Sequence, residues 1–186
     1  MALQLVNEKI QCFLIDLRGF GFSTGYRSVA DLIFLQSDII TLLNSVKLNC
    51  PFFVYAHSIS ASIIMGLLIN NPALKISGLI LSCPQLGSKR EQKTFLHKLI
   101  DKFSGFYLRS CSIDPSELTT DPPLVLTMCK QMARIERIHL INDYNDSIID
   151  NAKFITLPII IFQGDCDTIA SLIYTEEFFS RVNRFA

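Results

Sequence analysis

Apolar residues follow two different spacings along this chain. Four short runs are almost wholly apolar and rich in β-branched or aromatic residues, which is typical of buried strands. They lie at residues 10–15, 52–55, 76–81 and 157–162. Other segments repeat apolar residues at helical spacing, which predicts helices packed along one face. They lie at residues 1–7, 29–46, 59–71 and 171–182.

The order of these elements predicts the fold class. Strands and helices alternate from residue 10 to residue 83, and a strand and a helix follow again after residue 156. Such alternation is typical of an α/β domain in which helices cover both faces of a parallel sheet. Because both faces are then buried, each strand is a continuous apolar run. We therefore expect four parallel strands whose carboxyl ends meet at one side of the sheet.

Residues 51–71 carry the most informative local pattern. An aromatic and β-branched run at 52–55 is followed by small residues around Ser58 and then by helical spacing. This order predicts a strand, a sharp turn and a helix, in which the serine lifts its Oγ above the sheet beside the first helix amides. Only small side chains fit two residues before and after such a serine, and here they are Ala56 and Ser60.

Two other interpretations of this stretch stay open at the level of sequence. Ser58 could be the ordinary N-cap of a helix that follows a buried strand. Residues 52–69 contain no Asp, Glu, Lys or Arg, so they could instead span a membrane. His57, the serines inside this segment and the polar turn at 70–72 argue against a membrane span.

Composition narrows the classes of function. The 186 residues suffice for one domain with a substantial core. Seventeen basic and seventeen acidic residues cancel, so the chain shows no electrostatic footprint for nucleic acid. The start of the chain lacks the basic region and long apolar core of a signal peptide. We therefore expect an intracellular setting, in the cytoplasm or at the periphery of membranes.

The six cysteines show no paired spacing such as Cys-x-x-Cys. Cys12, Cys50, Cys83 and Cys129 lie within or beside apolar runs. This placement predicts reduced cysteines in the core and neither disulfides nor a metal site.

A glycine-punctuated loop at residues 16–23 follows the first apolar run. A dinucleotide-binding turn is one interpretation of two glycines after a strand. However, a third glycine is absent at the required spacing, and no acidic strand end follows. We therefore expect no bound dinucleotide, and no other cofactor.

Four stretches of the sequence occur in a recognisable order. They are Ile-Asp-Leu-Arg-Gly-Phe-Gly-Phe-Ser at 15–23, Ala-His-Ser-Ile-Ser at 56–60, Gly-Leu-Ile-Leu-Ser-Cys-Pro at 78–84 and Leu-Pro-Ile-Ile-Ile-Phe-Gln-Gly-Asp-Cys-Asp at 157–167. They resemble the post-strand loop, the nucleophile elbow, the sixth strand, and the seventh strand with its acid loop in one group of α/β-hydrolases. That group contains the monoacylglycerol lipase and serine aminopeptidase-like (lysophospholipase-type) enzymes.

The resemblance implies a serine hydrolase of lipid esters, of which monoacylglycerol and lysophospholipid are the group's usual substrates. Such hydrolysis needs a nucleophile, a base, an acid that orients the base, and two oxyanion donors. By resemblance, Ser58 is the nucleophile and the amide of Ile59 is one oxyanion donor. Asp167 is the acid, with Asp165 as the alternative. A turn or helix-cap role is the other interpretation of Asp167.

The resemblance leaves the catalytic base without a match. In this fold the triad runs Ser, Asp, His along the chain, and no histidine follows Asp167. We expect His57 to pack near its strand as a buried core histidine, away from the serine Oγ, and His97 and His139 to lie on solvated helix faces. The group's His-Gly oxyanion loop, its first three strands and its eighth strand have no match either. The expected fold is therefore a partial α/β-hydrolase fold, incomplete at both ends.

The interruption of the strand–helix order corresponds to the lid insertion of the group. We expect residues 1–83 to form the first part of the hydrolase core, residues 84–156 a helical lid over the carboxyl ends of the strands, and residues 157–186 a truncated second part. Residues 89–108 interleave apolar and basic residues at helical spacing. Such a helix can pack on the domain or rest on a lipid surface. On a single helix, Phe95, Leu99 and Phe103 should share one face.

Two functions are consistent with these patterns. One is a serine hydrolase of lipid-like esters by lineage, impaired in this chain because the histidine and the His-Gly loop have no match. The alternative is a truncated or degenerate hydrolase without catalysis, which at most binds a lipid or a partner. A lipid-like ester is the expected ligand, and peripheral membrane contact through the lid is an open alternative.

Overall fold

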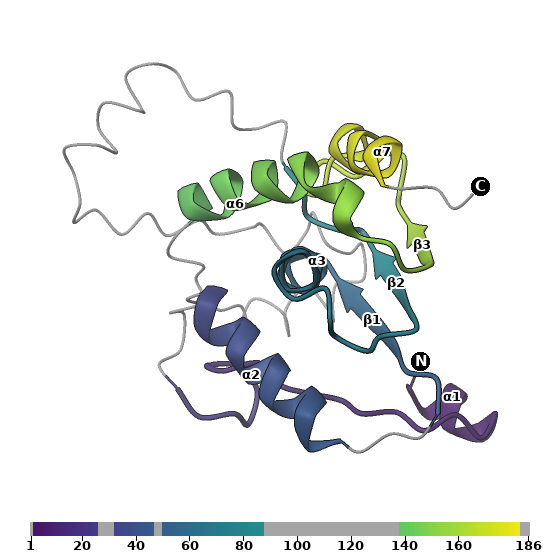
Figure 1. Cartoon of the computed structure of the whole chain (residues 1–186). Helices are drawn as coiled ribbons and strands as arrows, with labels where there is room; N and C mark the ends of the chain where they lie inside the picture. Colours follow the sequence, from purple (N-terminus) through teal and green to yellow (C-terminus); the bar gives the residue numbers. More distant parts are fainter. Residues whose placement is uncertain (1, 26–31, 47–49, 88–137, 183–186) are drawn as a thin grey trace, which may run out of the picture.

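A computed structural model describes residues 2–25, 32–46, 50–87 and 138–182 (Figure 1). Its helices are α1 (Ala2–Asn7), α2 (Leu32–Ser45), α3 (Ile59–Asn70), α6 (Ile138–Asp150), the short 3-10 helix η2 (Ala152–Phe154) and α7 (Leu172–Arg181). Its strands are β1 (Phe53–His57), β2 (Gly78–Ser82) and β3 (Ile159–Phe162). The predicted lid helix at 89–108 lies outside the described residues, so its arrangement stays a prediction.

The three strands form one parallel sheet in the order β1-β2-β3. Tyr55 of β1 is paired with Ile80 of β2, which is paired with Ile160 of β3. The predicted strand, turn and helix at 51–71 are therefore confirmed, and a continuous membrane helix there is excluded. In the described parts of the chain, no helix is long and apolar enough to cross a membrane.

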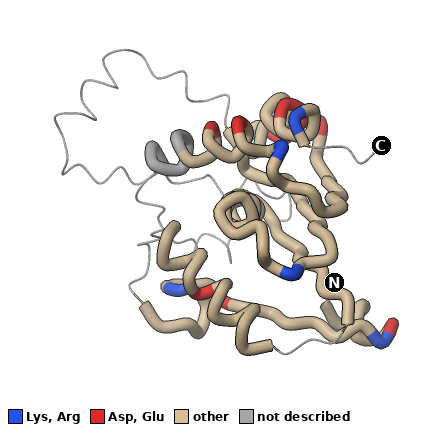
Figure 2. The backbone as a smooth tube through the Cα atoms, viewed as in Figure 1, with Lys and Arg blue, Asp and Glu red and all other residues tan. Residues whose placement is uncertain are grey.

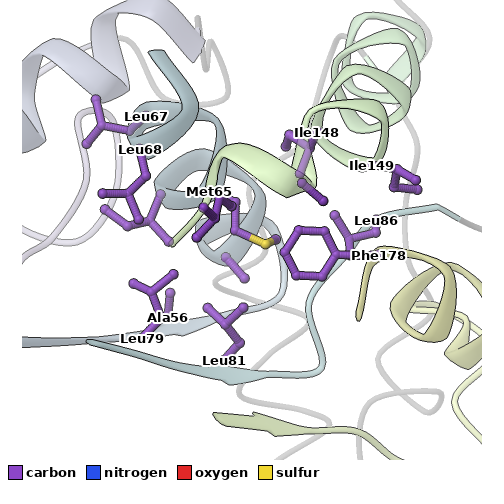
Figure 3. Packing of buried hydrophobic residues seen from close by; sticks show 14 of the residues in the cluster. Ala56, Met65, Leu67, Leu68, Leu79, Leu81, Leu86, Ile148, Ile149 and Phe178 are labelled. Carbon is purple, nitrogen blue, oxygen red and sulfur yellow. The ribbon is translucent and has the colours of Figure 1, made fainter. Parts of the chain in front are cut away.

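Helix α3 is the centre of the core. All eight of its residues from 61 to 68 are buried, which is typical of a helix enclosed by its neighbours. It packs on β1, α2 and α6, and Figure 3 shows Met65 reaching the ring of Phe178 from α7. Residues buried around it from other elements include Ala56, Leu79, Leu81, Leu86, Ile148, Ile149, Ala152, Ile155 and Phe178.

Among the described residues, helices cover one face of the sheet, so helices over the other face stay a prediction. Alternate strand residues point to opposite faces. Leu79 and Leu81 point into the core, whereas Phe53, Tyr55, Ile160 and Phe162 on the other face are 56%, 46%, 57% and 59% exposed. The strands are continuously apolar, as a doubly covered sheet requires, but the described residues supply helices to one face alone.

The prediction of a strand at residues 10–15 is wrong. These residues form no strand, and the side chains of Ile10, Phe13, Leu14 and Ile15 are exposed. An apolar run becomes a strand only through hydrogen bonds to a neighbour. Among the described residues, no backbone hydrogen bond joins this run to β1, and β1 is an edge strand.

The expected burial of the cysteines is also corrected. Cys50 is exposed, and Cys12 and Cys83 are only half-buried. Cys12 lies within the exposed run at 10–15, and Cys50 precedes the run at 52–55. Apolar neighbours in the sequence therefore did not place either cysteine in the core. Cys129 lies outside the described residues.

Candidate active site

Ser58 occupies the turn between β1 and α3 in a backbone conformation that few residues adopt. Its φ of 54° and ψ of −123° fall in a region that normally belongs to glycine. An ordinary N-cap residue has extended dihedrals and a side chain that caps the helix, whereas Ser58 makes no side-chain cap hydrogen bond. The geometry therefore favours the sharp nucleophile turn over the N-cap interpretation.

Backbone hydrogen bonds hold this turn to the end of β2. The N–H of Ser58 donates to the carbonyl of Ser82 at 3.0 Å, and the N–H of Gln85 donates to the carbonyl of Ser58 at 3.2 Å. The hydroxyl of Ser62 in α3 also donates to the carbonyl of Gln85. Residues 82–85 thus bind both the turn and the first turn of α3, which stabilises the strained conformation of Ser58.

Ile59 is the first residue of α3. At that position the backbone N–H has no acceptor within the helix and lies at the positive end of the helix dipole. Ala56 is buried and Ser60 half-buried on either side of the turn, so small side chains do fill the two positions that need them. The chemistry available here is a serine hydroxyl beside a donor suited to a developing oxyanion.

Tyr144 of α6 supports α3 from the side opposite the sheet. Its hydroxyl accepts a hydrogen bond from Gln36 Nε2 of α2 at 2.7 Å and lies 3.3 Å from the carbonyl oxygen of Ser62. Burial raises the pKa of Tyr144 to about 12, although the Gln36 hydrogen bond works in the opposite direction. A Cβ on Gly66 would lie 2.0 Å from the Tyr144 hydroxyl oxygen, so this close approach requires glycine.

The loop at 16–23 folds back on itself around Asp16. The Asp16 carboxylate accepts a hydrogen bond from the N–H of Phe22 at 2.9 Å. Gly21 has a φ of 51°, and a Cβ there would lie 2.1 Å from the same carboxylate, which accounts for the glycine. Arg18 is bound to Asp38 of α2 through two hydrogen bonds of 2.9 and 2.6 Å. These bonds lower the pKa of Asp38 and join the loop to α2.

Asp167 belongs to the loop that follows β3. Its Oδ1 accepts hydrogen bonds from the N–H groups of Ile169 and Ala170 at 2.9 and 2.8 Å. Gln163 Nε2 donates to its Oδ2 at 3.3 Å and to the carbonyl of Ala170 at 2.8 Å. The turn role weighed for Asp167 is therefore present, and it fixes the position of the carboxylate.

Ser58 and Asp167 lie beyond the carboxyl ends of β1 and β3, so both are at the carboxyl-terminal end of the sheet. Strand β2 separates their strands, and the loop that follows it contacts both sides. The N–H of Gln85 donates to the carbonyl of Ser58, and the carbonyl of Gly87 accepts from the N–H of Ser171 at 3.3 Å. Whether Ser58, Ile59 and Asp167 act as nucleophile, oxyanion donor and acid stays a prediction. Asp165, the alternative acid, is exposed in the same loop.

His57 lies on β1 with its Nδ1 3.4 Å from the hydroxyl of Ser82. It therefore belongs to the exposed face of the sheet that carries Phe53 and Tyr55. It is exposed and not the buried histidine that the sequence suggested, because none of the described helices covers that face. His97 and the side chain of His139 lie outside the described residues.

Three residues with clear structural roles were not singled out from the sequence. Gln163 organises the Asp167 loop, Tyr144 joins α2, α3 and α6, and Cys83, directly after β2, turns the chain with a φ of 44°. A single glutamine or tyrosine has no periodic signature, and Cys83 precedes a proline, which disfavours helical backbone without predicting a positive φ. Only the contacts of the folded chain identify them.

A cavity of about 780 Å³ lies at the amino ends of β1 and β2. It is lined by Leu43, Pro51, Phe52, Leu74 and Ser77, among others. Ser58 and Asp167 lie at the opposite ends of these parallel strands, so this cavity is separate from the candidate active site.

Comparison with solved structures identifies the class of fold. The structure is similar to a monoacylglycerol lipase of Paleococcus ferrophilus, with a TM-score of 0.76 and 20% identity over 90% of this chain and 67% of that one. It is also similar to a Lipase-esterase related protein of Clostridium acetobutylicum (TM-score 0.64, 17% identity, 97% and 74% covered). A third is an esterase of Thermogutta terrifontis (TM-score 0.59, 18% identity, 90% and 66% covered). These likenesses define an α/β-hydrolase fold.

A family model described as "Serine aminopeptidase, S33" matches residues 1–184. The chain therefore belongs to this family of α/β-hydrolases, as the four motifs predicted. It spans 66% to 74% of the length of the three solved structures named above. No curated protein sequence matches it.

The contact between Gly66 and Tyr144 can be tested by a double-mutant cycle. Gly66→Ala should destabilise the protein by about 1–3 kcal/mol, because the new methyl group overlaps the phenol. In a Tyr144→Ala background the same change should be neutral or stabilising by about 0.5–1 kcal/mol, because alanine is the better helix former. Urea denaturation measures both differences, and equal effects in the two backgrounds would contradict the close approach.

The buried phenol predicts a loss of stability at high pH. Below pH 10 Tyr144 is neutral in both states, whereas between pH 10 and its folded pKa of about 12 it ionises only in the unfolded chain. The unfolded state then binds fewer protons, so the free energy of unfolding falls as pH rises through this range. Tyr144→Phe should show a smaller decrease between pH 10 and 12 in denaturation experiments. An unchanged slope would mean that Tyr144 is not buried as described.

The hydrogen bonds of Asp167 predict different effects for two substitutions. Asp167→Ala removes the acceptor of two backbone amides and should cost about 1–2 kcal/mol of stability. Asp167→Asn keeps a carbonyl oxygen for those amides and should cost less. Denaturation midpoints compare the two variants, and equal losses would show that the carboxylate charge, and not its acceptor geometry, stabilises the loop.

Proposed function

We propose that the turn at Ser58 is the nucleophile position of a carboxylic ester hydrolase site, and that this chain is impaired in turnover without an added base. The observation that carries the proposal is the backbone of Ser58, with φ 54° and ψ −123°, between strand β1 and the N-terminus of α3. Such backbone strain lowers the stability of the folded state by about 1–3 kcal/mol and is typically retained at functional sites that depend on the strained conformation. Here it is useful because it places a hydroxyl beside the Ile59 amide.

The proposed chemistry begins with attack of the Ser58 Oγ on an acyl carbonyl. The oxygen of the tetrahedral intermediate is stabilised by the Ile59 N–H, and the hydroxyl proton must pass to a base. Asp167 is the proposed acid that would orient a histidine, but none follows it in the sequence. The missing base lowers the rate by roughly 10²–10⁴-fold. A missing second oxyanion donor lowers it by roughly another 10²–10³-fold.

Lipid-like esters are the proposed substrates. The support is the family and the likeness to a monoacylglycerol lipase, together with the lid-like insertion predicted at 84–156. Contact with a membrane surface through the basic apolar pattern at 89–108 belongs to the same proposal. The second candidate, a hydrolase without catalysis that binds a lipid or a partner, is favoured by the absence of any histidine after Asp167.

Added imidazole can separate these two functions because it supplies a diffusible base. Without imidazole, the full chain should not hydrolyse a short-chain monoglyceride faster than the buffer does. With imidazole, the chain should hydrolyse the ester faster than imidazole does in the absence of protein. This gain should disappear in Ser58→Ala and persist in Ser180→Ala, which removes an exposed hydroxyl of α7. Labelling of the same three proteins by a fluorophosphonate, with and without imidazole, gives a readout that does not depend on the ester chosen.

Equal imidazole-stimulated rates in the wild-type chain and Ser58→Ala would remove Ser58 as the nucleophile and favour the non-catalytic function. Turnover without imidazole that is lost in Ser58→Ala would keep the nucleophile and contradict the impairment. In that case another group of this chain, such as His97 or His139, or a partner chain, supplies the base.

A further inference from the structure

The peptide group between Ser58 and Ile59 carries the N–H that is proposed as an oxyanion donor. A trans peptide is planar, and its C=O and N–H point in opposite directions. Any contact that fixes the direction of the Ser58 carbonyl therefore also fixes the direction of the Ile59 N–H. The Ser58 carbonyl accepts hydrogen bonds from the N–H of Ala61 at 3.1 Å and from the N–H of Gln85 at 3.2 Å. The Ile59 N–H thus points away from Gln85.

The side chain of Ser62 holds Gln85 in this position. Its hydroxyl donates to the carbonyl of Gln85, so both backbone groups of Gln85 are bonded to the first turn of α3. A serine inside a helix can instead donate to the carbonyl four residues earlier, which for Ser62 is the carbonyl of Ser58. Here the hydroxyl bonds to the loop after β2, and the Ser58 carbonyl accepts from Gln85. Ser62 thus holds the residue whose N–H orients the Ser58 carbonyl.

The hydrogen bond of Ser62 is formed away from water and from charged side chains. Ser62 is 1% exposed, and its own carbonyl accepts from the Tyr144 hydroxyl at 3.3 Å. Residues 76–87 contain no Asp, Glu, Lys or Arg, and Figure 2 shows the sheet and α3 without them too. Hydrogen bonds are stronger in such surroundings than in water, and an acceptor that loses its donor there is destabilising. Without the hydroxyl, the loop should therefore shift so that the Gln85 carbonyl finds another donor.

We propose that Ser62 is a positioning residue, whose hydroxyl orients the Ile59 N–H through the backbone of Gln85. The group that this N–H would bind is the oxyanion formed when Ser58 attacks an acyl or phosphonyl centre. Such a donor is effective only when it points at the place where the charge develops. The chemical role rests on the proposed function, whereas the orientation of the N–H can be measured without any reaction.

The first test measures the direction of the Ile59 N–H by its residual dipolar coupling, with the N–H groups of residues 61–68 as the reference frame. In Ser62→Ala this coupling should change while the frame stays the same, and amide exchange at Gln85 should accelerate by at least about tenfold. Ser62→Thr keeps the hydroxyl and should restore both values. The control Ile155→Val shortens a side chain that is 1% exposed and lies in another element, and it should change neither.

The second test measures labelling of Ser58 by a fluorophosphonate in the presence of imidazole. The rate should fall by at least about tenfold in Ser62→Ala, because removing an oxyanion donor outright costs roughly 10²–10³-fold. In Ser62→Thr and Ile155→Val the rate should stay within about twofold of the wild-type rate, since both keep the donor in place.

The two tests separate this inference from the proposed function. An unchanged Ile59 coupling in Ser62→Ala overturns the inference, and so does an equal change in Ile155→Val, which would indicate general loosening. A changed coupling that Ser62→Thr does not restore, with the α3 frame intact, also overturns it. A changed coupling with undiminished labelling would contradict the positioning role. A changed coupling without labelling of any protein, the wild-type chain included, would support the orienting contact and contradict the proposed function.

Discussion

The burial of α3 on every side is the constraint on which the rest of this structure depends. Helix α3 follows the strained residue Ser58 directly, and a strain of order 1–3 kcal/mol persists only where surrounding contacts determine the conformation. Burying one Ile, Leu or Met side chain contributes about 1.5–3 kcal/mol, and α3 buries several, including Ile64, Met65 and Leu67. The apolar packing of one helix therefore suffices to hold the serine in its unusual conformation.

That packing is also specific, because polar groups fix how α3 meets its neighbours. The Tyr144 hydroxyl fills the space over Gly66 and joins α6 to α2 through Gln36. On the other side, the backbone of Gln85 binds both Ser58 and Ser62. Hydrophobic burial alone would allow α3 to rotate or slide, whereas these hydrogen bonds have only one satisfied arrangement. The position of the Ser58 hydroxyl is thus coupled to α2, α6 and the end of β2.

Among the described residues, the core packs against one face of the sheet. Leu79 and Leu81 contact the core, while Ile160 and Phe162 face outward and stay exposed. A parallel sheet usually has both faces covered. Among the described residues, this face of the sheet and the outer edge of β1 have no covering element. The exposed run at 10–15 has the same cause, since the hydrogen bonds that would make it a strand need a neighbour that the described residues lack.

The sequence by itself determined the local elements and the family. Strand, turn and helix around Ser58 follow from β-branched and small residues at short range, and the order of four motifs is sufficient for the S33 assignment. Tertiary structure alone decided which apolar runs become strands. Residues 10–15 and 159–162 are both mainly apolar runs, yet only the second pairs with a described strand, because pairing depends on a distant neighbour and not on the run itself. The same dependence on distant contacts hid Tyr144 and Gln163 from sequence patterns, since a single hydrogen-bonding side chain has no period.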